Sequence, residues 1–408
     1  MYGGRINLPK RNDDFFREKK PWSVIKDSLL GCYLEPYFAK ILNTRKPLVY
    51  VDCFAGKGQF DDGNLGSPCI ALNIFKNRLE KSGVKSPAQT IEAHFIELHY
   101  AKELRKNLES YYGMQNLDIV VDASDYEKQI QQILDRKSNA NIFLYLDPYG
   151  VKHLDFNFLS SLSKKFNSAE LLINFNSHGF LRVACKFLKI DVPAEINWSY
   201  LAEYDNDFNI PLNKSEEMLN KVAGGNYWQD LTRLYYNKDM SFYQLEETLS
   251  QAYCKNLKRY YTYVLNMPIR IKENYSPKYR MIYATNHPDG AILMADNIYK
   301  RIGQLHEIQY GGQQLLFGLD YDVYNAEKLI MEYLSKINVI ERLSVVQAKF
   351  FTDYGVICNS SDFSNIVANL EKSGALEIIR NPDKTKTGRP RRFYNECTGQ
   401  TLKLKWKN

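Results

Sequence analysis

Apolar runs and amphipathic stretches alternate along the chain from residue 22 to residue 174. Runs typical of buried strands occupy residues 48–51, 90–98, 117–121, 141–146 and 169–174. Apolar residues at helical spacing predict helices over residues 22–42, 69–81, 101–111, 126–134 and 156–165. Strands that alternate with helices favour an α/β fold with a parallel, doubly wound, Rossmann-like sheet. The run at 279–284 predicts a late strand of the same sheet.

The segments outside this alternation divide the chain into domains. Residues 1–20 are polar and basic, which predicts a flexible basic arm. Residues 177–278 are mostly helical in pattern and rich in aromatic side chains, which predicts a helical insertion that covers the mouth of the sheet. We therefore expect the α/β domain to span residues 21–176 and 279–319, and residues 320–408 to form a C-terminal domain. The aromatic residues of the insertion include Trp198, Tyr200, Tyr204, Trp228, Tyr235, Tyr236, Tyr243 and the run at 260–263.

The C-terminal domain has the pattern of a winged helix. Helices are predicted over residues 325–334, 345–352 and 362–373, and short strands over 375–380 and 391–394. Three helices that end in a basic hairpin are typical of relatives of helix-turn-helix DNA-binding proteins. The chain has a net charge of +7, from 54 basic and 47 acidic side chains, and much of the excess lies beyond residue 380. As phosphate contacts we select Lys386, Arg389, Arg391 and Arg392, although a solvated basic hairpin would have the same pattern.

The first predicted strand leads into an acid and a glycine-rich turn. Asp52 ends the strand, and Phe54, Ala55, Gly56 and Gly58 belong to the turn. Open α/β sheets bind nucleotides at the carboxyl ends of their strands, where backbone N–H groups are exposed. In a site for S-adenosylmethionine, such a turn lets the backbone approach the amino-acid part of the cofactor, and the acid helps to hold the ammonium group.

Two other nucleotide sites do not fit the spacing of this turn. The dinucleotide pattern G-x-G-x-x-G requires a third glycine where this chain has Asp61. A P-loop requires Ser or Thr after its Gly-Lys pair, and here Lys57 is followed by Gly58. The turn therefore predicts neither a dehydrogenase nor a P-loop nucleotidase.

Two further strands end in acids that suit the rest of such a cofactor. Glu97 follows the second strand, where a carboxylate can accept both ribose hydroxyl groups. Asp122 and Ala123 follow the third strand, where they could contact the adenine amine and ring. Each acid has another reading: Asp52 and Asp122 can cap a turn or a helix, and Glu97 can be a solvated strand end.

The fourth strand ends in Asp147, Pro148, Tyr149 and Gly150, a sequence that suits methyl transfer to a planar amine. The lone pair of such an amine is delocalised, so acceptors for its hydrogens assist its attack on a methyl group. The Asp147 carboxylate and the Pro148 carbonyl could accept these hydrogens, while Tyr149 stacks on the ring, as aromatic side chains do on bases taken out of a helix. Positioning and electrostatics would then do most of the catalytic work, because a sulfonium is already a reactive methyl donor.

Composition and cysteine spacing exclude several other classes of protein. The seven cysteines are far apart, without a C-x-x-C pair, so we expect neither a disulfide framework nor a cysteine-rich metal site. No apolar run reaches the ~18 residues of a membrane span. The first residues lack the apolar core of a signal peptide, and we expect a cytoplasmic protein.

Taken together, these motifs resemble the bacterial three-Cys-motif partner protein family (TcmP). The resemblance rests on YVDCFAGKG (50–58), GSP (66–68), FIE (95–97), DPYG (147–150) and ATNHPDG (284–290), in that order. It covers roughly residues 20–310 and, more loosely, the C-terminal domain. It implies a class I S-adenosylmethionine-dependent methyltransferase-like fold and a partner with a three-cysteine motif of the radical-S-adenosylmethionine kind, the phage Gp37/Gp68 family. The DPYG motif is also similar to the Asp-Pro-Phe-Gly of tRNA guanine N2-methyltransferases.

We therefore expect an S-adenosylmethionine-dependent methyltransferase that acts on nucleic acid, at an exocyclic base nitrogen. The alternative is a non-catalytic accessory that delivers nucleic acid or S-adenosylmethionine to the radical-enzyme partner, in phage defence or a mobile element. A nuclease with carboxylate-bound metal fits less well, because Asp52, Glu97 and Asp147 are spread along the sheet edge rather than paired in one motif.

Overall fold

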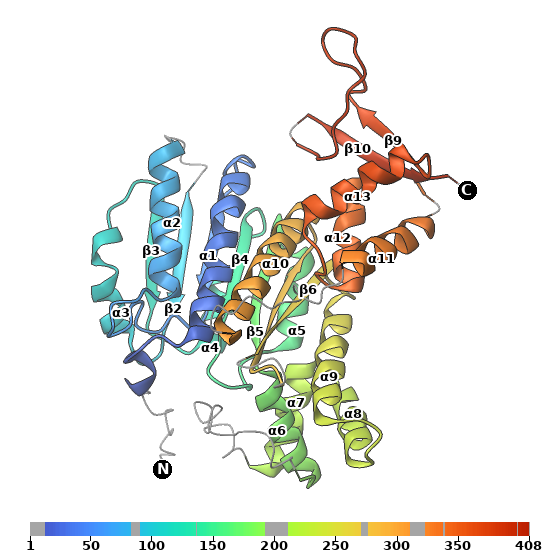
Figure 1. Ribbon diagram of the computed structural model, residues 1–408. Helices are drawn as coiled ribbons and strands as arrows, with labels where there is room; N and C mark the ends of the chain where they lie inside the picture. Colours follow the sequence, from blue (N-terminus) through green and yellow to red (C-terminus); the bar gives the residue numbers. More distant parts are fainter. Residues whose placement is uncertain are drawn as a thin grey trace, which may run out of the picture. The chain divides into compact units, whose positions relative to one another are not determined.

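The chain forms two compact units in the computed structural model (Figure 1). The model describes residues 13–82, 90–135, 137–191, 211–270, 276–310, 323–337, 339–397 and 399–407. The first unit comprises Met1–Tyr260 and Pro268–Ile282, and the second comprises Tyr261–Met267 and Tyr283–Asn408. The domain boundary that we expected near residue 320 lies outside the described residues.

A seven-stranded sheet has the order β3-β2-β1-β4-β5-β7-β6. Its strands are β1 (Leu48–Asp52), β2 (Ile91–Ile96), β3 (Leu117–Asp122), β4 (Asn141–Leu146), β5 (Ser168–Phe175), β6 (Tyr263–Ile269) and β7 (Tyr279–Thr285). β1 to β5 pair in parallel, in the order that doubly wound nucleotide-binding folds use. The Rossmann-like sheet is therefore confirmed. β6 was not predicted, because its apolar run lies within the segment that we expected to be helical.

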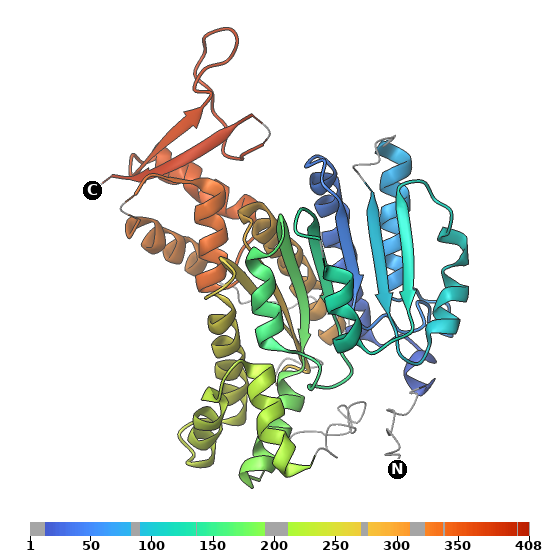
Figure 2. The ribbon, with the colours of Figure 1, turned by 180° about the vertical axis from the view of Figure 1, so that it is seen from behind.

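The helices of the first unit cover both faces of this sheet. α1 (Pro21–Leu42) and α2 (Ser67–Ser82) lie on one face in Figure 1, and α4 (Tyr126–Leu134) and α5 (Phe156–Ser161) lie on the opposite face, seen in Figure 2. Every residue of β1, β4 and β5 is buried as a result. The shorter elements are the 3-10 helix η1 (Asp13–Phe16), α3 (Ala101–Asn107), and the 3-10 helices η3 (Glu109–Tyr111) and η4 (Leu162–Lys164).

The predicted insertion contains α6 (Ser177–Leu188), α7 (Leu212–Ala223), α8 (Tyr227–Tyr236) and α9 (Phe242–Leu257). A buried ion pair joins α9 to β7, with Arg280 donating to both carboxylate oxygens of Glu246 at 2.9 and 2.6 Å. The hydroxyl of Ser177, at the start of α6, also donates to Glu246. This network fixes the first helix of the insertion, α9 and β7 to one another. Trp198, Tyr200 and Tyr204 lie outside the described residues.

The second unit ends in three helices and a small sheet. The elements that follow β7 are α10 (Pro288–Tyr310), α11 (Val323–Ser335), β8 (Glu341–Arg342), α12 (Leu343–Tyr354), α13 (Ser360–Lys372), β9 (Leu376–Asn381) and β10 (Thr401–Trp406), and the order of the small sheet is β8-β10-β9. Asp296 of α10 accepts hydrogen bonds from the backbone and hydroxyl of Ser360, which ties α10 to α13. The second strand that we predicted at 391–394 is wrong: β10 pairs with β9 instead, because Leu402 and Leu404 alternate with exposed lysines and bury one face.

None of the helices in the described part of the chain is long and apolar enough to cross a membrane.

Candidate active site

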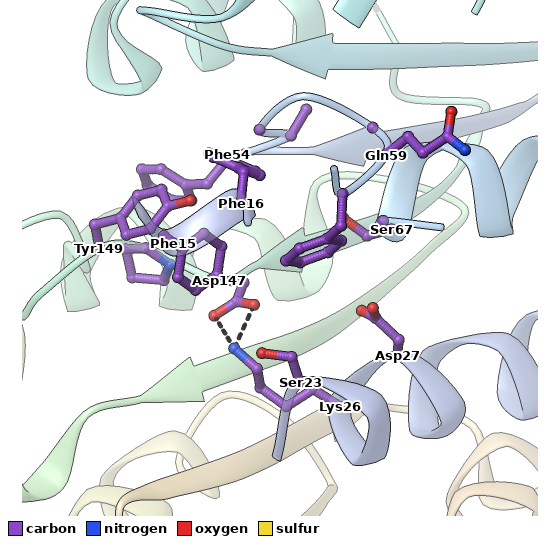
Figure 3. Close-up of a pocket in the computed structure, with 16 residues that line it drawn as sticks. Phe15, Phe16, Ser23, Lys26, Asp27, Phe54, Gln59, Ser67, Asp147 and Tyr149 are labelled. Carbon is purple, nitrogen blue, oxygen red and sulfur yellow. Dashed lines mark hydrogen bonds and ion pairs between the residues drawn. The ribbon is translucent and has the colours of Figure 1, made fainter. Parts of the chain in front are cut away.

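A pocket of the first unit lies over the ends of β1 and β4, and Figure 3 shows its residues. The turn after β1 supplies Phe54, Ala55, Gly56 and Gly58, and the loop after β4 supplies Asp147, Pro148 and Tyr149. α1 supplies Ser23, Lys26 and Asp27, and the start of α2 supplies Ser67. The pocket encloses only about 60 Å³, which is far less than the ~300 Å³ or more of common ligand sites. A ligand of nucleoside size therefore requires some of these residues to move.

The glycine turn has a conformation that its sequence requires. Gly56 and Gly58 have φ angles of +63° and +77°, in the left-handed region that favours glycine. A Cβ atom on Gly58 would lie 2.9 Å from the side chain of Leu104. The turn is held to its neighbours by the backbone bonds from Cys53 N to Tyr145 O (2.9 Å) and from Ala55 N to Ile96 O (3.0 Å). Three adjacent strands thus fix the backbone that faces the pocket.

Glu97 holds the turn rather than facing the pocket. Its two carboxylate oxygens accept hydrogen bonds from the backbone N–H groups of Gly56 (2.8 Å), His99 (2.8 Å) and Tyr100 (3.1 Å). The side chain is buried and does not line the pocket. In the structure, both oxygens thus bind backbone N–H groups. The ribose contact expected of Glu97 stays a prediction.

Asp122 and Ala123 also lie outside the pocket. The Asp122 carboxylate accepts a hydrogen bond from Gln129 at 2.9 Å and approaches the His94 ring at 3.5 Å. Ala123 is exposed at the end of β3. These contacts place Asp122 among the side chains of β2 and α4, and the expected adenine contact stays a prediction.

Asp52 is fully buried beneath the turn and does not line the pocket. Its Oδ1 accepts the backbone N–H of Phe54 at 3.3 Å, and a hydrogen bond from the Ser67 hydroxyl also acts on its pKa. Burial is the largest effect and raises the pKa of this carboxyl to about 7. Asp52 therefore ties the turn to the start of α2, the capping role that we weighed against cofactor binding.

Asp147 is held by side chains from three elements. Lys26 Nζ donates to its Oδ1 at 2.9 Å and to its Oδ2 at 2.7 Å, drawn as dashed lines in Figure 3. Asn174 donates to Oδ1 at 2.6 Å, and the Tyr145 hydroxyl donates to Oδ2 at 3.2 Å. This network fixes the carboxylate and therefore the Pro148–Tyr149 segment that follows it. Gly150, the last residue of the motif, has φ +90° and does not line the pocket.

The N-terminal segment, residues 13–20, covers one side of the pocket. The Phe16 ring lies against Gly56, where an added Cβ would come within 3.0 Å of it. Phe15 packs edge-on against Tyr149, with ring centroids 5.3 Å apart (Figure 3). In the described part of the expected flexible arm, the two phenylalanines pack in an aromatic cluster with Phe60.

Sequence patterns missed Asp27 and Lys19, which form an ion pair at 2.5 Å. Both side chains are nearly inaccessible, at 7% exposed for Lys19 and 12% for Asp27. Burial raises the pKa of the Asp27 carboxyl, although the nearby Lys19 ammonium opposes this shift. A signal was present in the sequence: Ser23, Lys26 and Asp27 interrupt the apolar pattern of α1 at helical spacing, so they share one face.

The basic hairpin between β9 and β10 belongs to the second unit. Lys386, Arg389 and Arg392 are exposed, and Arg391 donates from its Nε to the Lys384 carbonyl at 3.1 Å. The base of the hairpin is fixed by a two-bond contact between Arg380 and Glu371, both at 2.7 Å. The Glu371 carboxylate therefore neutralises the positive charge of Arg380.

No protein-family profile matches the chain, and no curated protein sequence matches it either. Among solved structures, the chain is similar to the plantazolicin methyltransferase BamL, crystallised with a triazolic desmethylPZN analog and SAH. The identity is 12%, the TM-score is 0.25, and the match covers 65% of this chain and 85% of that one. A TM-score this low supports no conclusion about the cofactor or the substrate.

Proposed function

We propose that the protein is an S-adenosylmethionine-dependent methyltransferase that acts on nucleic acid, at an exocyclic base nitrogen. The observation that carries the proposal is the meeting of two motifs in one pocket: the glycine turn after β1 and the Asp147–Tyr149 loop after β4. The parallel pairing of β1 with β4 brings their carboxyl ends side by side. A donor site and an acceptor site then adjoin, as methyl transfer requires.

The residues of the pocket fit the amino-acid end of the proposed cofactor. Gly56 and Gly58 line the pocket and have positive φ angles, so the backbone there has no Cβ atoms and has a conformation that other residues rarely adopt. Asp27, which lines the pocket, already binds a primary ammonium group, that of Lys19. When bound, S-adenosylmethionine would supply an electrophilic methyl group. Because the pocket encloses about 60 Å³, the fit also requires the N-terminal segment to move.

The acceptor side would be formed by the loop after β4. The Pro148 carbonyl and an Asp147 oxygen would accept hydrogens of the target amine, and Tyr149 would stack on its ring. Tyr149 is 38% exposed, and Phe15 now lies against its ring. Lys26 would keep the Asp147 carboxylate in place but also offset its charge. Asp147 would therefore serve here as a hydrogen-bond acceptor more than as a base.

For the second unit we propose a winged helix that holds the nucleic-acid backbone. Its support is the order of three helices and a sheet in which the last strand lies between the other two. The hairpin from residue 382 to residue 400 would be the wing. Its exposed basic residues would contact phosphates without reading sequence.

The test combines donor binding with transfer. Purified protein would be given methyl-labelled S-adenosylmethionine and, separately, total tRNA and genomic DNA. We expect label in one nucleic acid with the wild type, at least ~100-fold less with Asp147→Ala, and no change with Asp155→Asn. Asp155 is a suitable control because it caps α5 and does not line the pocket. Transfer that is unaffected by Asp147→Ala would refute the assignment of the acceptor site.

The network around Asp147 also supports a second function. Both oxygens of this carboxylate already accept hydrogen bonds, from Lys26, Asn174 and Tyr145. An accessory protein without transfer activity would not need either oxygen to accept hydrogens from a target amine. The protein would then be a TcmP family member that delivers S-adenosylmethionine or nucleic acid to a radical-enzyme partner with a three-cysteine motif. Donor binding without Asp147-dependent transfer to any nucleic acid would favour this second function.

A further inference from the structure

We propose that Asp27 is the binding site for the amino group of the methyl donor, and that Lys19 occupies this site when the donor is absent. The inference rests on the proposed donor pocket, and it replaces the role expected of Asp52. It gives the N-terminal segment a function as an internal competitor of the donor.

The position of Asp27 supports the first part. Asp27 and Ser23 lie one helical turn apart on α1, and both line the pocket together with Ser67 and the glycine turn. Asp52, by contrast, is fully buried and does not line the pocket. Of these two acids, Asp27 is the one whose carboxylate a ligand in the pocket can reach.

The partner of Asp27 supports the second part. The Lys19 ammonium lies 2.5 Å from the Asp27 carboxylate and donates to the Leu65 carbonyl at 2.6 Å. A carboxylate and a carbonyl oxygen around a primary ammonium form the same donor and acceptor set that an amino-acid ammonium requires. Lys19 thus has the chemistry of the proposed ligand.

The proposal requires the segment that carries Lys19 to move as a unit. Residues 13–20 precede α1, and Asp13, Phe16 and Lys19 make polar contacts to the turn and loop after β1. These include the Lys19 N–H to Asp62 (2.9 Å), the Lys19 ammonium to Leu65, the Asp61 N–H to the Phe16 carbonyl (2.8 Å) and the ion pair of Asp13 with Lys57 (3.8 Å). Because the Phe16 ring rests on Gly56, removal of the segment would free the glycine turn and Asp27 together.

This arrangement predicts which part of the donor each side chain affects. S-Adenosylhomocysteine carries the amino-acid group, whereas 5′-methylthioadenosine lacks it. Asp27→Asn should weaken binding of S-adenosylhomocysteine by about tenfold or more, as expected for loss of a charge-assisted contact. The same change should alter binding of 5′-methylthioadenosine by less than about twofold.

Lys19→Ala should act in the opposite direction. It removes the internal competitor and leaves Asp27 without its partner, so S-adenosylhomocysteine should bind about three- to tenfold more tightly. In the double variant Lys19→Ala/Asp27→Asn, the gain should disappear, because it depends on the free carboxylate. Lys20→Ala is the matched control: its side chain is 39% exposed and pairs only loosely with Glu18, at 3.4 Å.

Isothermal titration of the full chain with both ligands tests the proposal, and thermal unfolding of each variant checks that it is folded. In Asp27→Asn, Lys19 loses its buried partner. The double variant lacks this lysine and therefore controls for the effect of an unpaired Lys19.

If all variants bind both ligands and Asp27→Asn shows no selective loss, the assignment of Asp27 is wrong while donor binding stands. If Lys19→Ala weakens binding, the segment is a lid that closes over the donor, and the competitor is refuted. If neither the wild type nor any variant binds either ligand, the proposed function itself fails.

Discussion

Lys26 binds both carboxylate oxygens of Asp147, although 121 residues separate them in the chain. The lysine side chain is 6% exposed and the aspartate 22%. The ammonium also lies 4.9 Å from the centre of the Tyr279 ring. A largely buried ion pair thus joins α1 to the loop after β4, and the geometry of the candidate acceptor site depends on a helix that precedes the first strand.

Replacement of Lys26 by methionine should destabilise the first unit. Asp147 would keep Asn174 and Tyr145 but lose its opposite charge in a mostly dry site, so we expect a loss of about 3 kcal/mol in the free energy of unfolding. Urea denaturation measures the change. The double variant Lys26→Met/Asp147→Asn should recover most of the loss, because no unpaired charge remains. A single variant as stable as the wild type would show that the pair does not hold the loop.

Alanine at Gly58 should destabilise the protein more than alanine at Gly63, a glycine of the loop that follows. Gly58→Ala and Gly63→Ala both place a side chain at positive φ, at +77° and +85°, which costs about 1–2 kcal/mol. Only Gly58→Ala also brings the new Cβ to 2.9 Å from Leu104, whereas nothing lies within 4 Å of a Cβ on Gly63. We expect Gly58→Ala to lose at least about 1 kcal/mol more in urea denaturation. Equal losses would mean that Leu104 moves aside freely.

Much of the sheet follows from the sequence because its strands are short, apolar and buried on both faces. The predicted run at 141–146 matches β4, and the run at 48–51 differs from β1 by one residue. The acid or turn after each run then identifies the edge at which ligands bind. The meeting of the glycine turn and the Asp147 loop was therefore predictable, since parallel neighbours end at the same edge.

The remaining residues of the site depend on contacts that local patterns do not encode. Phe15, Phe16 and Lys19 belong to a short polar segment without periodicity, and they are fixed by a distant loop. Glu97 and Asp52 had the residue type expected of ligands, but Glu97 accepts the N–H of Gly56 in the turn and Asp52 Oδ1 accepts the N–H of Phe54. Residue type and strand position cannot distinguish these two uses of a carboxylate.

Tyr149 should matter for transfer through its ring and not through its hydroxyl group. Under the proposed function, Tyr149→Phe keeps the stacking surface and should retain the kcat/KM of the wild type within about threefold, whereas Tyr149→Ala should lower it about 10- to 100-fold. Steady-state methyl transfer to the nucleic acid identified above measures both. If phenylalanine is as damaging as alanine, the hydroxyl group takes part and the stacking role is refuted.

Asp52 should make stability depend on pH near neutrality. Burial raises its pKa from the usual value for an aspartate, about 3.9, to about 7, so the folded state binds this proton more tightly than the unfolded chain does. Stability is therefore highest while the group is protonated in both states and falls as the pH rises from about 4 to 7. Asp52→Asn should remove this loss, which urea denaturation at pH 4.5, 6 and 8 would show as a flatter profile. A parallel pH profile in both proteins would contradict the raised pKa.

The basic hairpin gives the last prediction, on the salt dependence of nucleic-acid binding. If Arg389, Arg391 and Arg392 contact phosphates, replacing all three by alanine removes up to three released counterions. The slope of log K against log salt should then fall by roughly 2 to 3 for duplex DNA.

The matched control replaces Lys102, Lys106 and Lys128 on α3 and α4, which are exposed and carry the same total charge. This control should leave the slope within about 0.5 of the wild type, because the proposal assigns the released counterions to phosphate contacts of the hairpin alone. Fluorescence anisotropy with a labelled duplex from 50 to 200 mM salt resolves such differences. An unchanged slope in the hairpin variant would refute the phosphate contacts, whereas an equal fall in both variants would assign the effect to net charge rather than to the hairpin.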